Sequence, residues 1–283
     1  MSQYFPDELR EVYGKYKSYI REDGVHLLEG SGARVIPIMD TESDEETLSK
    51  LALVNGVLFP GGHPERGYLA KAQFIYDQAI EINDAGTYFP LFGICKGFLY
   101  MSFFAADAGK DISVDLRSQE TSLPIKFTVD PAETKMFKDI GERQKDYESV
   151  AFAYNMHDNS IAVDSFETDA GLKDMFKLTS TCTDESEGTT FGCSMESDKY
   201  PFAAVMFHPE KQIGQWYDDI GLNHSWESIQ LNRYFADYYV NMAREQSYNA
   251  GDFSAVQKMI IENYDHFVTD TTDGDVYVFD KIN

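Results

Sequence analysis

Cys95 is the residue of this sequence whose surroundings best suit chemistry. It stands in the run Phe92–Phe98, "FGICKGF", with Gly93 and Gly97 two positions to either side. A strand that ends at a nucleophile between small residues and leads directly into a helix has the form of a nucleophile elbow. The free N–H groups and the dipole at the start of that helix favour the thiolate, which is the reactive form. The pattern predicts a cysteine nucleophile, and the alternative is a buried structural cysteine.

A thiol nucleophile needs a base and a group that orients the base, and His208 and Glu210 meet this need. His208 directly follows the apolar run "FAAVMF", Phe202–Phe207, and Pro209 then fixes a turn before Glu210. This arrangement predicts that Glu210 holds the imidazole of His208 in the tautomer that accepts the thiol proton. The alternative is a strand-end histidine beside a surface glutamate.

Acyl transfer also needs donors for the oxygen that becomes negative, and Gly61-Gly62 offers them. The two glycines end the strand-like run "VLFP". Bare backbone N–H groups in such a loop can point at an oxyanion, and the N–H of Lys96 is the natural second donor beside that of Gly62. An ordinary turn after a strand is the alternative. A phosphate-binding loop is not expected, because no Gly-Lys-Ser or Gly-Lys-Thr follows.

The first half of the chain alternates strand-like and helix-like segments that would position these residues. Strands are expected within Gly32–Met39, Ala52–Gly62 and Tyr88–Cys95, and the apolar spacing of Glu65–Asp84 predicts a helix. Continuous apolar strands separated by amphipathic helices indicate a parallel sheet covered on both faces. We therefore expect an α/β fold with three layers, in which a mostly parallel central sheet is flanked by helices.

The second half of the chain is less regular and adds antiparallel pairing. Further strands are expected in the runs 123–130, 149–157, 175–182, 189–195 and 202–210. Ser225–Glu245 has the spacing of a strongly amphipathic helix, and the tail holds a helical piece, 253–264, and an apolar end, 275–280. No break in composition marks a boundary, so residues 1–283 are expected to form a single domain.

Composition excludes several classes of partner. The 283 residues carry a formal net charge of −24, and no clustered basic surface for a nucleic acid is found. No run approaches the roughly 18 apolar residues of a membrane helix, and Met1–Tyr19 is too polar for a signal peptide. No metal and no cofactor are expected. Cys182 and Cys193 flank a polar stretch where a hairpin could set them opposite each other, so a disulfide and two free thiols are both open.

Three motifs stand in order along the chain, "LFPGG", "FGICKGF" and "FHPEK". Together they resemble those of the class I glutamine amidotransferase family, whose members share a Cys-His-Glu triad on an α/β sheet. The finer resemblance is to the γ-glutamyl hydrolase family, and it also covers "GSGARVIPI", "YFPLFGICKGF", "RYFADYYVNMARE" and the closing "YVFD". It extends over nearly the whole chain from about Ser18 and implies a flavodoxin-like fold with an added antiparallel hairpin.

The resemblance implies roles for particular residues. Cys95 would be the nucleophile, His208 the general base and acid, and Glu210 its orienting partner. The N–H groups of Gly62 and Lys96 would form the oxyanion hole. The resemblance also implies that His157 is a further active-site histidine. Gly61, His63 and Lys96 would contact the substrate.

The implied reaction is hydrolysis of a γ-glutamyl amide bond through a thioester, in folylpoly-γ-glutamates or other γ-glutamyl peptides. The implied partners are this small substrate and either a second copy of the chain or a larger complex, with no nucleic acid and no membrane. Members of the family are lysosomal, vacuolar or secreted, whereas the polar N-terminus leaves a cytoplasmic location open.

Two features depart from the family pattern and support competing hypotheses. Leu99 stands four residues after the nucleophile, where the hydrolases carry glutamate and the amidotransferases glutamine, and it can neither hydrogen-bond nor carry charge. No apolar first strand of the family type is found before Tyr19, so this strand is expected to be missing. The competing hypotheses are a catalytically weak or inactive relative that serves as a structural or binding subunit, and a glutaminase that passes ammonia to a synthetase.

Overall fold

The computed structural model describes residues 1–5, 13–62, 67–116, 120–184, 186, 188–216, 221–246, 253–268 and 274–280. Within these ranges the strands are β1 (Gln3–Tyr4), β2 (Ser18–Arg21), β3 (Val57–Phe59), β4 (Leu91–Ile94), β5 (Ser113–Asp115), β6 (Thr121–Leu123), β7 (Lys126–Phe127), β8 (Ala153–Asn155), β9 (Asn159–Ile161), β10 (Lys177–Thr183), β11 (Thr190–Glu196), β12 (Phe202–Val205), β13 (Asp265–Phe267) and β14 (Val276–Phe279). The α-helices are α2 (Glu22–Gly30), α3 (Asp44–Leu51), α4 (Gly67–Asp84), α5 (Lys96–Ala105), α6 (Gln144–Ser149), α7 (Ser165–Thr168), α8 (Ala170–Met175), α9 (Lys211–Gly214), α10 (Trp226–Glu245) and α11 (Phe253–Val256). No helix in these ranges is both long and apolar enough to cross a membrane.

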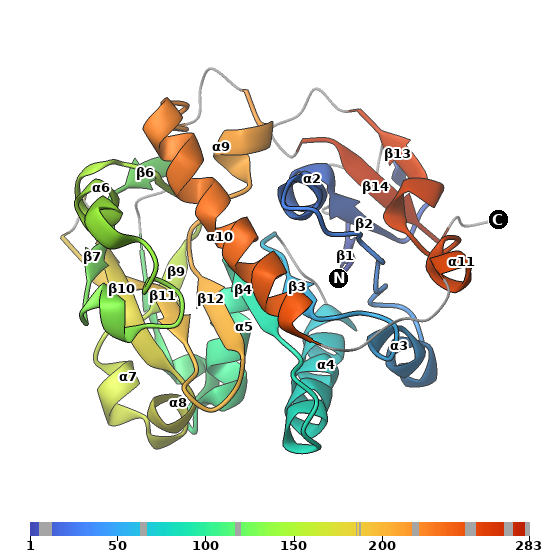
Figure 1. Ribbon diagram of the computed structural model, residues 1–283, viewed down its shortest axis with the longest axis horizontal. Coiled ribbons are helices and arrows are strands. Elements are labelled where there is room, and N and C mark those ends of the chain that lie inside the picture. The colour runs from blue at the N-terminus through green and yellow to red at the C-terminus, as the bar shows by residue number, and fades with distance from the viewer. Residues whose placement is uncertain are drawn as a thin grey trace.

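The central sheet has the strand order β3-β4-β12-β11-β10-β7 (Figure 1). β3, β4 and β12 run parallel, with Phe59 opposite Gly93 and Val205 opposite Ile94. β11, β10 and β7 are antiparallel to their neighbours, and β10 and β11 form the expected hairpin. The α/β class is confirmed. The sheet is mixed rather than mostly parallel, because this hairpin and β7 make up its second half.

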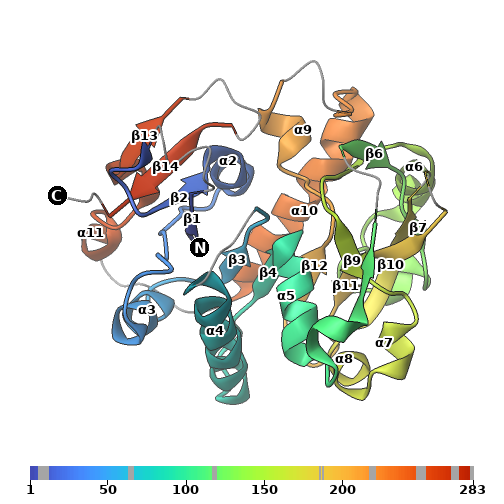
Figure 2. The same cartoon turned by 180° about the vertical axis from the view of Figure 1, so that it is seen from behind.

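Helices cover both faces of the central sheet. Figure 1 shows α10 across one face, and the turned view in Figure 2 shows α4 and α5 on the other. Phe92 of β4 stacks on Tyr239 of α10, with ring centroids 5.4 Å apart, and Tyr76 of α4 contacts Phe202 of β12 at 5.7 Å. Burying each such large side chain contributes about 1.5–3 kcal/mol. The three layers therefore hold the ends of β3, β4 and β12 in fixed positions.

Most of the expected elements are present, and two expectations are wrong. The expected helix 65–84 is α4, and the expected helix 225–245 is α10. The first wrong expectation is the strand within Gly32–Met39, which forms no strand. Its backbone makes scattered bonds instead, such as those from Ser2 N–H to Ile38 O and from Ile261 N–H to Val35 O. Both this stretch and β3 line a cavity of about 540 Å³. Among the described residues no strand pairs with the stretch to complete a ladder. The expected helix 253–264 is reduced to α11 and one 3₁₀ turn at its end.

A second sheet, with the order β1-β2-β14-β13, joins the two ends of the chain. Its blue and red strands lie side by side in both views (Figures 1 and 2). Apolar side chains pack on both of its faces, with Tyr19 and Val278 in one cluster and Ile20 and Phe279 in another. β14 is the apolar end that the sequence predicts. β1, which precedes Tyr19, and β2, which contains Tyr19, were not expected from the sequence. They belong to this sheet and not to the central one.

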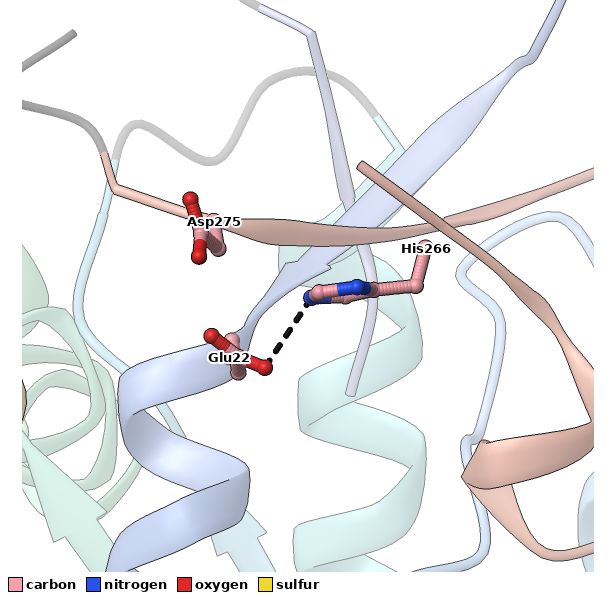
Figure 3. Close-up of side chains that lie close together, drawn as sticks. All are labelled: Glu22, His266 and Asp275. Atoms are coloured by element: carbon pink, nitrogen blue, oxygen red, sulfur yellow. Dashed lines mark ion pairs between the residues drawn. The ribbon is translucent and has the colours of Figure 1, made fainter. Parts of the chain in front are cut away.

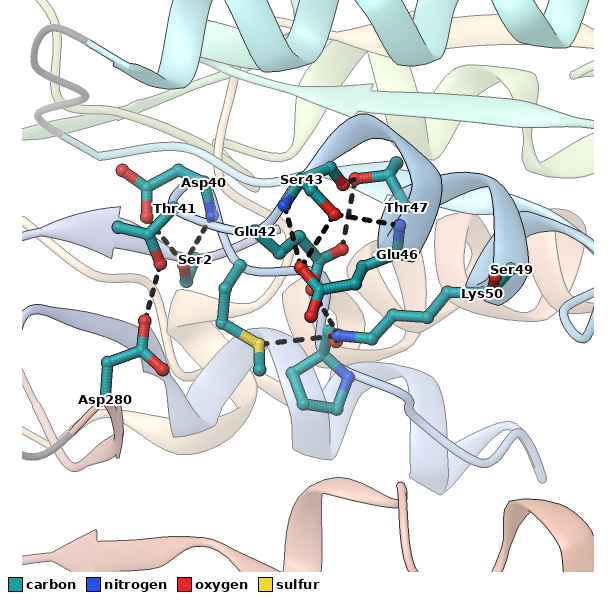
Figure 4. A network of polar contacts seen from close by, with 12 residues as sticks. Ser2, Asp40, Thr41, Glu42, Ser43, Glu46, Thr47, Ser49, Lys50 and Asp280 are labelled. Atoms are coloured by element: carbon teal, nitrogen blue, oxygen red, sulfur yellow. Dashed lines mark hydrogen bonds and ion pairs between the residues drawn. The ribbon is translucent and has the colours of Figure 1, made fainter.

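The N-terminal residues are fastened to the segment that leads into α3 by a network of polar contacts (Figure 4). Ser2 donates its hydroxyl to Asp40 Oδ1 (3.0 Å), and Asp40 donates its N–H back to the Ser2 hydroxyl (3.1 Å). α3 begins with a capping box, in which Ser43 and Glu46 each accept from the backbone N–H of the other. These contacts fix the start of β1 and thereby the place of Gln3.

Candidate active site

Cys95 lies on the sharp turn between β4 and α5. Its φ of 53° and ψ of −103° fall in the positive-φ region that residues other than glycine rarely adopt, and such strain costs of order 1–3 kcal/mol. Its N–H donates to the carbonyl of Val205 in β12 (2.9 Å), so the neighbouring strand holds the turn. The residue is 3% exposed. The turn has the shape that the sequence predicts for a nucleophile elbow.

Gly93 and Gly97 are required because three backbone segments approach closely at this turn. A Cβ atom on Gly93 would lie 2.7 Å from the carbonyl carbon of Gly97. A Cβ atom on Gly97 would lie 2.3 Å from the carbonyl oxygen of Phe59 in β3. Neither distance leaves room for a methyl group. The two glycines therefore let α5 start directly against β3 and β4.

His208 and Glu210 meet directly behind the thiol. His208 follows β12, and its N–H donates to the carbonyl of Tyr154 (2.8 Å). Its Nδ1 lies 2.6 Å from Glu210 Oε1, and both residues are buried. Cys95 lies close enough to His208 for each side chain to shift the pKa of the other. Because Glu210 occupies Nδ1, the other ring nitrogen is left for the thiol.

The charges of this cluster shift two pKa values in opposite directions. Burial would raise the pKa of Cys95, but the positive charge and hydrogen bond of His208, with a smaller effect of Lys96, outweigh burial and lower it. Burial would lower the pKa of His208, but the negative charges of Glu210 and Cys95 raise it to about 10. Both shifts favour a thiolate beside an imidazolium at neutral pH.

His157 lies close to this pair and stays neutral. It follows β8, is buried, and its Nε2 lies 2.9 Å from Asn155 Oδ1. Its ring meets that of Phe191 edge-on, with centroids 5.3 Å apart. Burial, followed by the positive charges of His208 and Lys96, lowers the pKa of His157 to about 3. His157 therefore adds a neutral polar group within electrostatic reach of the pair.

The Gly61-Gly62 loop passes directly over the thiol and the imidazole. A Cβ atom on Gly61 would lie 2.5 Å from Cε1 of His208 and 3.1 Å from Cβ of Cys95. Gly62 has a φ of 134°, which favours glycine, and a Cβ atom there would lie 2.1 Å from Gln3 Oε1. Gln3, which is 3% exposed, donates its Nε2 to the carbonyl of Gly61 (2.5 Å). Gln3 was not predicted from the sequence, because no motif marks this contact across 58 positions.

The remaining predicted positions lie on or next to α5, with one exception. Lys96 is the first residue of α5, where backbone N–H groups have no partner within the helix. Leu99 follows within the first turn, is buried in the core, and its N–H donates to the carbonyl of Cys95 (3.0 Å). His63 lies outside the described residues. Leu99 thus offers packing, and no polar group, beside the nucleophile.

Two tyrosines near the thiol were not predicted from the sequence. Tyr68 at the start of α4 and Tyr100 in α5 have ring centroids 5.8 Å apart. Burial is the main cause of the raised pKa of each, and the negative charge of Cys95 adds to it. Both hydroxyl groups are therefore close enough to Cys95 to sense its charge. The sequence marks them only by position: Tyr68 follows Gly61-Gly62 by a few residues, and Tyr100 follows Cys95 by a few residues.

The two other cysteines are joined to each other. Cys182 of β10 and Cys193 of β11 form a disulfide, with Cα atoms 5.5 Å apart. The sequence left a disulfide and two free thiols open, and the structure contains the disulfide. Cys95 is the free cysteine.

Comparisons with known proteins agree with this architecture. The family described as "Glutamine amidotransferase class-I" matches residues 10–224. "Gamma-glutamyl hydrolase B" of Dictyostelium discoideum is 29% identical over 99% of this chain and 81% of its own length, and the Homo sapiens "Gamma-glutamyl hydrolase" is 31% identical over 97% and 86%. The solved glutaminase domain of Trypanosoma brucei CTPS with bound acivicin has a TM-score of 0.51 at 14% identity, over 87% of this chain and 93% of that one, and supports the fold alone. The chain therefore belongs to the class I glutamine amidotransferase family and, within it, to the γ-glutamyl hydrolase family.

Proposed function

We propose that this chain hydrolyses γ-glutamyl amide bonds, with Cys95 as nucleophile, His208 as general base and acid, and Glu210 as the group that orients His208. The observation that carries the proposal is the buried cluster at the ends of adjacent parallel strands, in which Glu210 contacts Nδ1 of His208 and Cys95 lies within electrostatic reach of His208. The names of the relatives support γ-glutamyl substrates. The proposed substrates are folylpoly-γ-glutamates or other γ-glutamyl peptides.

The first half of the reaction follows from the charges of the pair. The thiolate of Cys95 attacks the carbonyl carbon of the γ-amide, and the carbonyl oxygen becomes an oxyanion bound by the N–H groups of Gly62 and Lys96. The C–N bond then breaks, and the imidazolium of His208 gives its proton to the departing amine. This half ends with a γ-glutamyl thioester on Cys95.

The second half regenerates the thiolate. His208, now neutral, takes a proton from water as the water oxygen adds to the thioester carbonyl. The C–S bond breaks, the thiolate of Cys95 leaves, and the γ-carboxylic acid of the product departs. Glu210 stabilises the imidazolium that forms in this step, through its bond to Nδ1. Atoms and charges balance with water as the second substrate.

Substrate carboxylates must enter a protein whose formal net charge is −24. Such a charge repels anions at long range, so a local positive potential is needed. Lys96 and protonated His208 supply it at the thiol, and the proposal assigns Lys96 and the Gly61 backbone to contacts with the substrate. Neutral His157 would add a polar contact that does not compete for the proton of His208.

The location and assembly of the chain belong to the same proposal. A disulfide between Cys182 and Cys193 persists in oxidising compartments and is rare where thiols are kept reduced. This supports a lysosomal, vacuolar or secreted enzyme over a cytoplasmic one. The proposed partners are the small substrate and a second copy of the chain or a larger complex.

One observation favours a second function. Leu99 is buried and presents no polar group at the position after Cys95 where the family resemblance implies a substrate contact. A structural or binding subunit with weak or absent catalysis would tolerate this loss. The two functions differ in whether Cys95 turns over a substrate.

The test is release of glutamate from a short poly-γ-glutamyl peptide by the purified chain. The parent should release glutamate, Cys95→Ala should release none, and the matched double variant Cys182→Ala/Cys193→Ala, which loses two cysteines but not the nucleophile, should retain activity. Free glutamine, assayed in parallel for ammonia, distinguishes a glutaminase. A folded parent that releases nothing from either substrate would refute the hydrolase and favour the subunit.

A further inference from the structure

A second group of ionisable side chains gathers beside the small sheet. Glu22, His266 and Asp275 each offer one ligand atom, and these atoms all lie within 4.8 Å of one another (Figure 3). His26 lies next to this group, since its Nε2 lies 3.3 Å from Glu22 Oε1. Together with His26, the group offers two imidazoles and two carboxylates. This donor set suits zinc and similar divalent transition metals.

Two separations, both measured to Glu22 Oε1, match those between ligands of one metal ion. Four ligands at about 2.0–2.1 Å from a tetrahedral zinc ion lie about 3.3 Å from one another. Nε2 of His266 lies 3.0 Å from Glu22 Oε1, and Nε2 of His26 lies 3.3 Å from the same oxygen. Two imidazoles thus converge on one carboxylate oxygen at the spacing of a coordination shell.

Backbone contacts hold the three contributing segments in place. Glu22 and His26 are one turn apart on α2, and the N–H of Glu22 donates to the carbonyl of Asp275 (2.8 Å). His266 stands opposite Tyr277 in the β13–β14 pair, and their rings have centroids 4.7 Å apart. The donors are therefore supported by regular structure before an ion arrives, which reduces the entropy that binding must overcome.

The surroundings are negative and open to solvent. Glu22 and Asp275 stand together in a chain whose formal net charge is −24. A cation would offset this accumulation of carboxylates. The side chains of Glu22, His266 and His26 are 19%, 30% and 52% exposed, so an ion can enter without unfolding of the chain.

We propose that Glu22, His26, His266 and Asp275 bind one Zn²⁺ ion or a similar divalent transition metal. Bound metal would clamp the C-terminal hairpin β13–β14 to the start of α2. The residue after Glu22, Asp23, forms an ion pair with buried Lys211 (3.0 Å). Lys211 directly follows Glu210, so the clamp would also steady the segment that carries this acid. The metal site itself does not depend on the proposed hydrolase activity.

The experiment is a zinc titration of the full chain after treatment with a chelator. Uptake is measured by competition with a chromophoric chelator, using Cys95→Ala as the host, since the active-site thiol and His208 could also take up zinc. We expect one equivalent for Cys95→Ala, and a loss of affinity of about ten-fold or more when His26→Ala and His266→Ala are added. His224→Ala is the matched control, because His224 stacks on Trp216 away from the group.

A further readout keeps the test decisive if the double variant does not fold. Zinc should raise the melting temperature of Cys95→Ala, and the isosteric Glu22→Gln in the same host should reduce that shift. The proposal is overturned if Cys95→Ala takes up no stoichiometric zinc, if the histidine substitutions leave affinity unchanged, or if Mg²⁺ binds as well as Zn²⁺.

Discussion

Gly97→Ala should destabilise the protein even though alanine is the better helix former. The added Cβ atom would lie 2.3 Å from the Phe59 carbonyl oxygen and 2.9 Å from Phe59 Cβ, which is about 1 Å closer than van der Waals contact. Phe59 cannot retreat freely, because β3 is paired with β4 opposite Gly93. Overpacking of this kind costs about 1–3 kcal/mol, and helix propensity returns at most about 1 kcal/mol. Even if helix propensity returns its full ~1 kcal/mol, a clash at the upper end of this range leaves a net loss of about 2 kcal/mol.

The same substitution should also reduce activity, since α5 begins at Cys95 and must shift to admit the methyl group. A displacement of about 1 Å at a reacting atom can cost about 10²-fold in rate. Urea unfolding measures the stability change, and glutamate release measures the rate.

Gly24→Ala is the matched control for this prediction. Gly24 lies within α2, and a Cβ atom there would have nothing within 4 Å, so the substitution should stabilise by about 0.5–1 kcal/mol. Opposite signs for two glycine-to-alanine changes in helices would support steric conflict as the cause. A Gly97→Ala variant that is as stable and as active as the parent would refute the reasoning.

Three further predictions concern the triad and the disulfide. Glu210→Gln should lower kcat by about 10²–10⁴-fold with little change in KM, because His208 loses its partner; an unchanged steady-state kcat would contradict this. The pKa of Cys95 is lowered, so the rate of its alkylation by iodoacetamide should fall far less between pH 8.5 and pH 6.5 than the roughly 50-fold expected for an ordinary thiol. The rate should fall steeply only when the pH drops through that lowered pKa. Removing the disulfide with Cys182→Ser/Cys193→Ser should cost about 3 kcal/mol in urea unfolding, and an unchanged midpoint would count against it.

The central part of the site could be predicted because its motifs end neighbouring parallel strands. Gly61, Cys95 and His208 follow β3, β4 and β12, and the ends of parallel strands meet at one edge of a sheet. Apolar runs locate those strands, and a histidine followed by proline and glutamate needs only a local turn. The hairpin was predictable for a similar reason, since its strands are close in sequence.

The small sheet and the contact of Gln3 could not be predicted in this way. β2 pairs with β14, so segments from opposite ends of the chain meet, and short apolar runs do not say which partner they will find. Gly32–Met39 shows the converse, because this apolar run of strand length forms no strand, and no strand in the described part of the chain pairs with it. The oxyanion donors, the single domain and the missing first family strand stay predictions.

The disulfide has a practical consequence for counting molecules. The chain has three cysteines, two of which are bonded to each other, so each folded molecule carries one titratable sulfhydryl, Cys95. The moles of sulfhydryl in a preparation therefore equal the moles of chain with an intact Cys95, and a chain whose Cys95 has been oxidised drops out of the count. Turnover can thus be expressed per competent molecule, and a ratio that rises from one towards three would report loss of the β10–β11 bond.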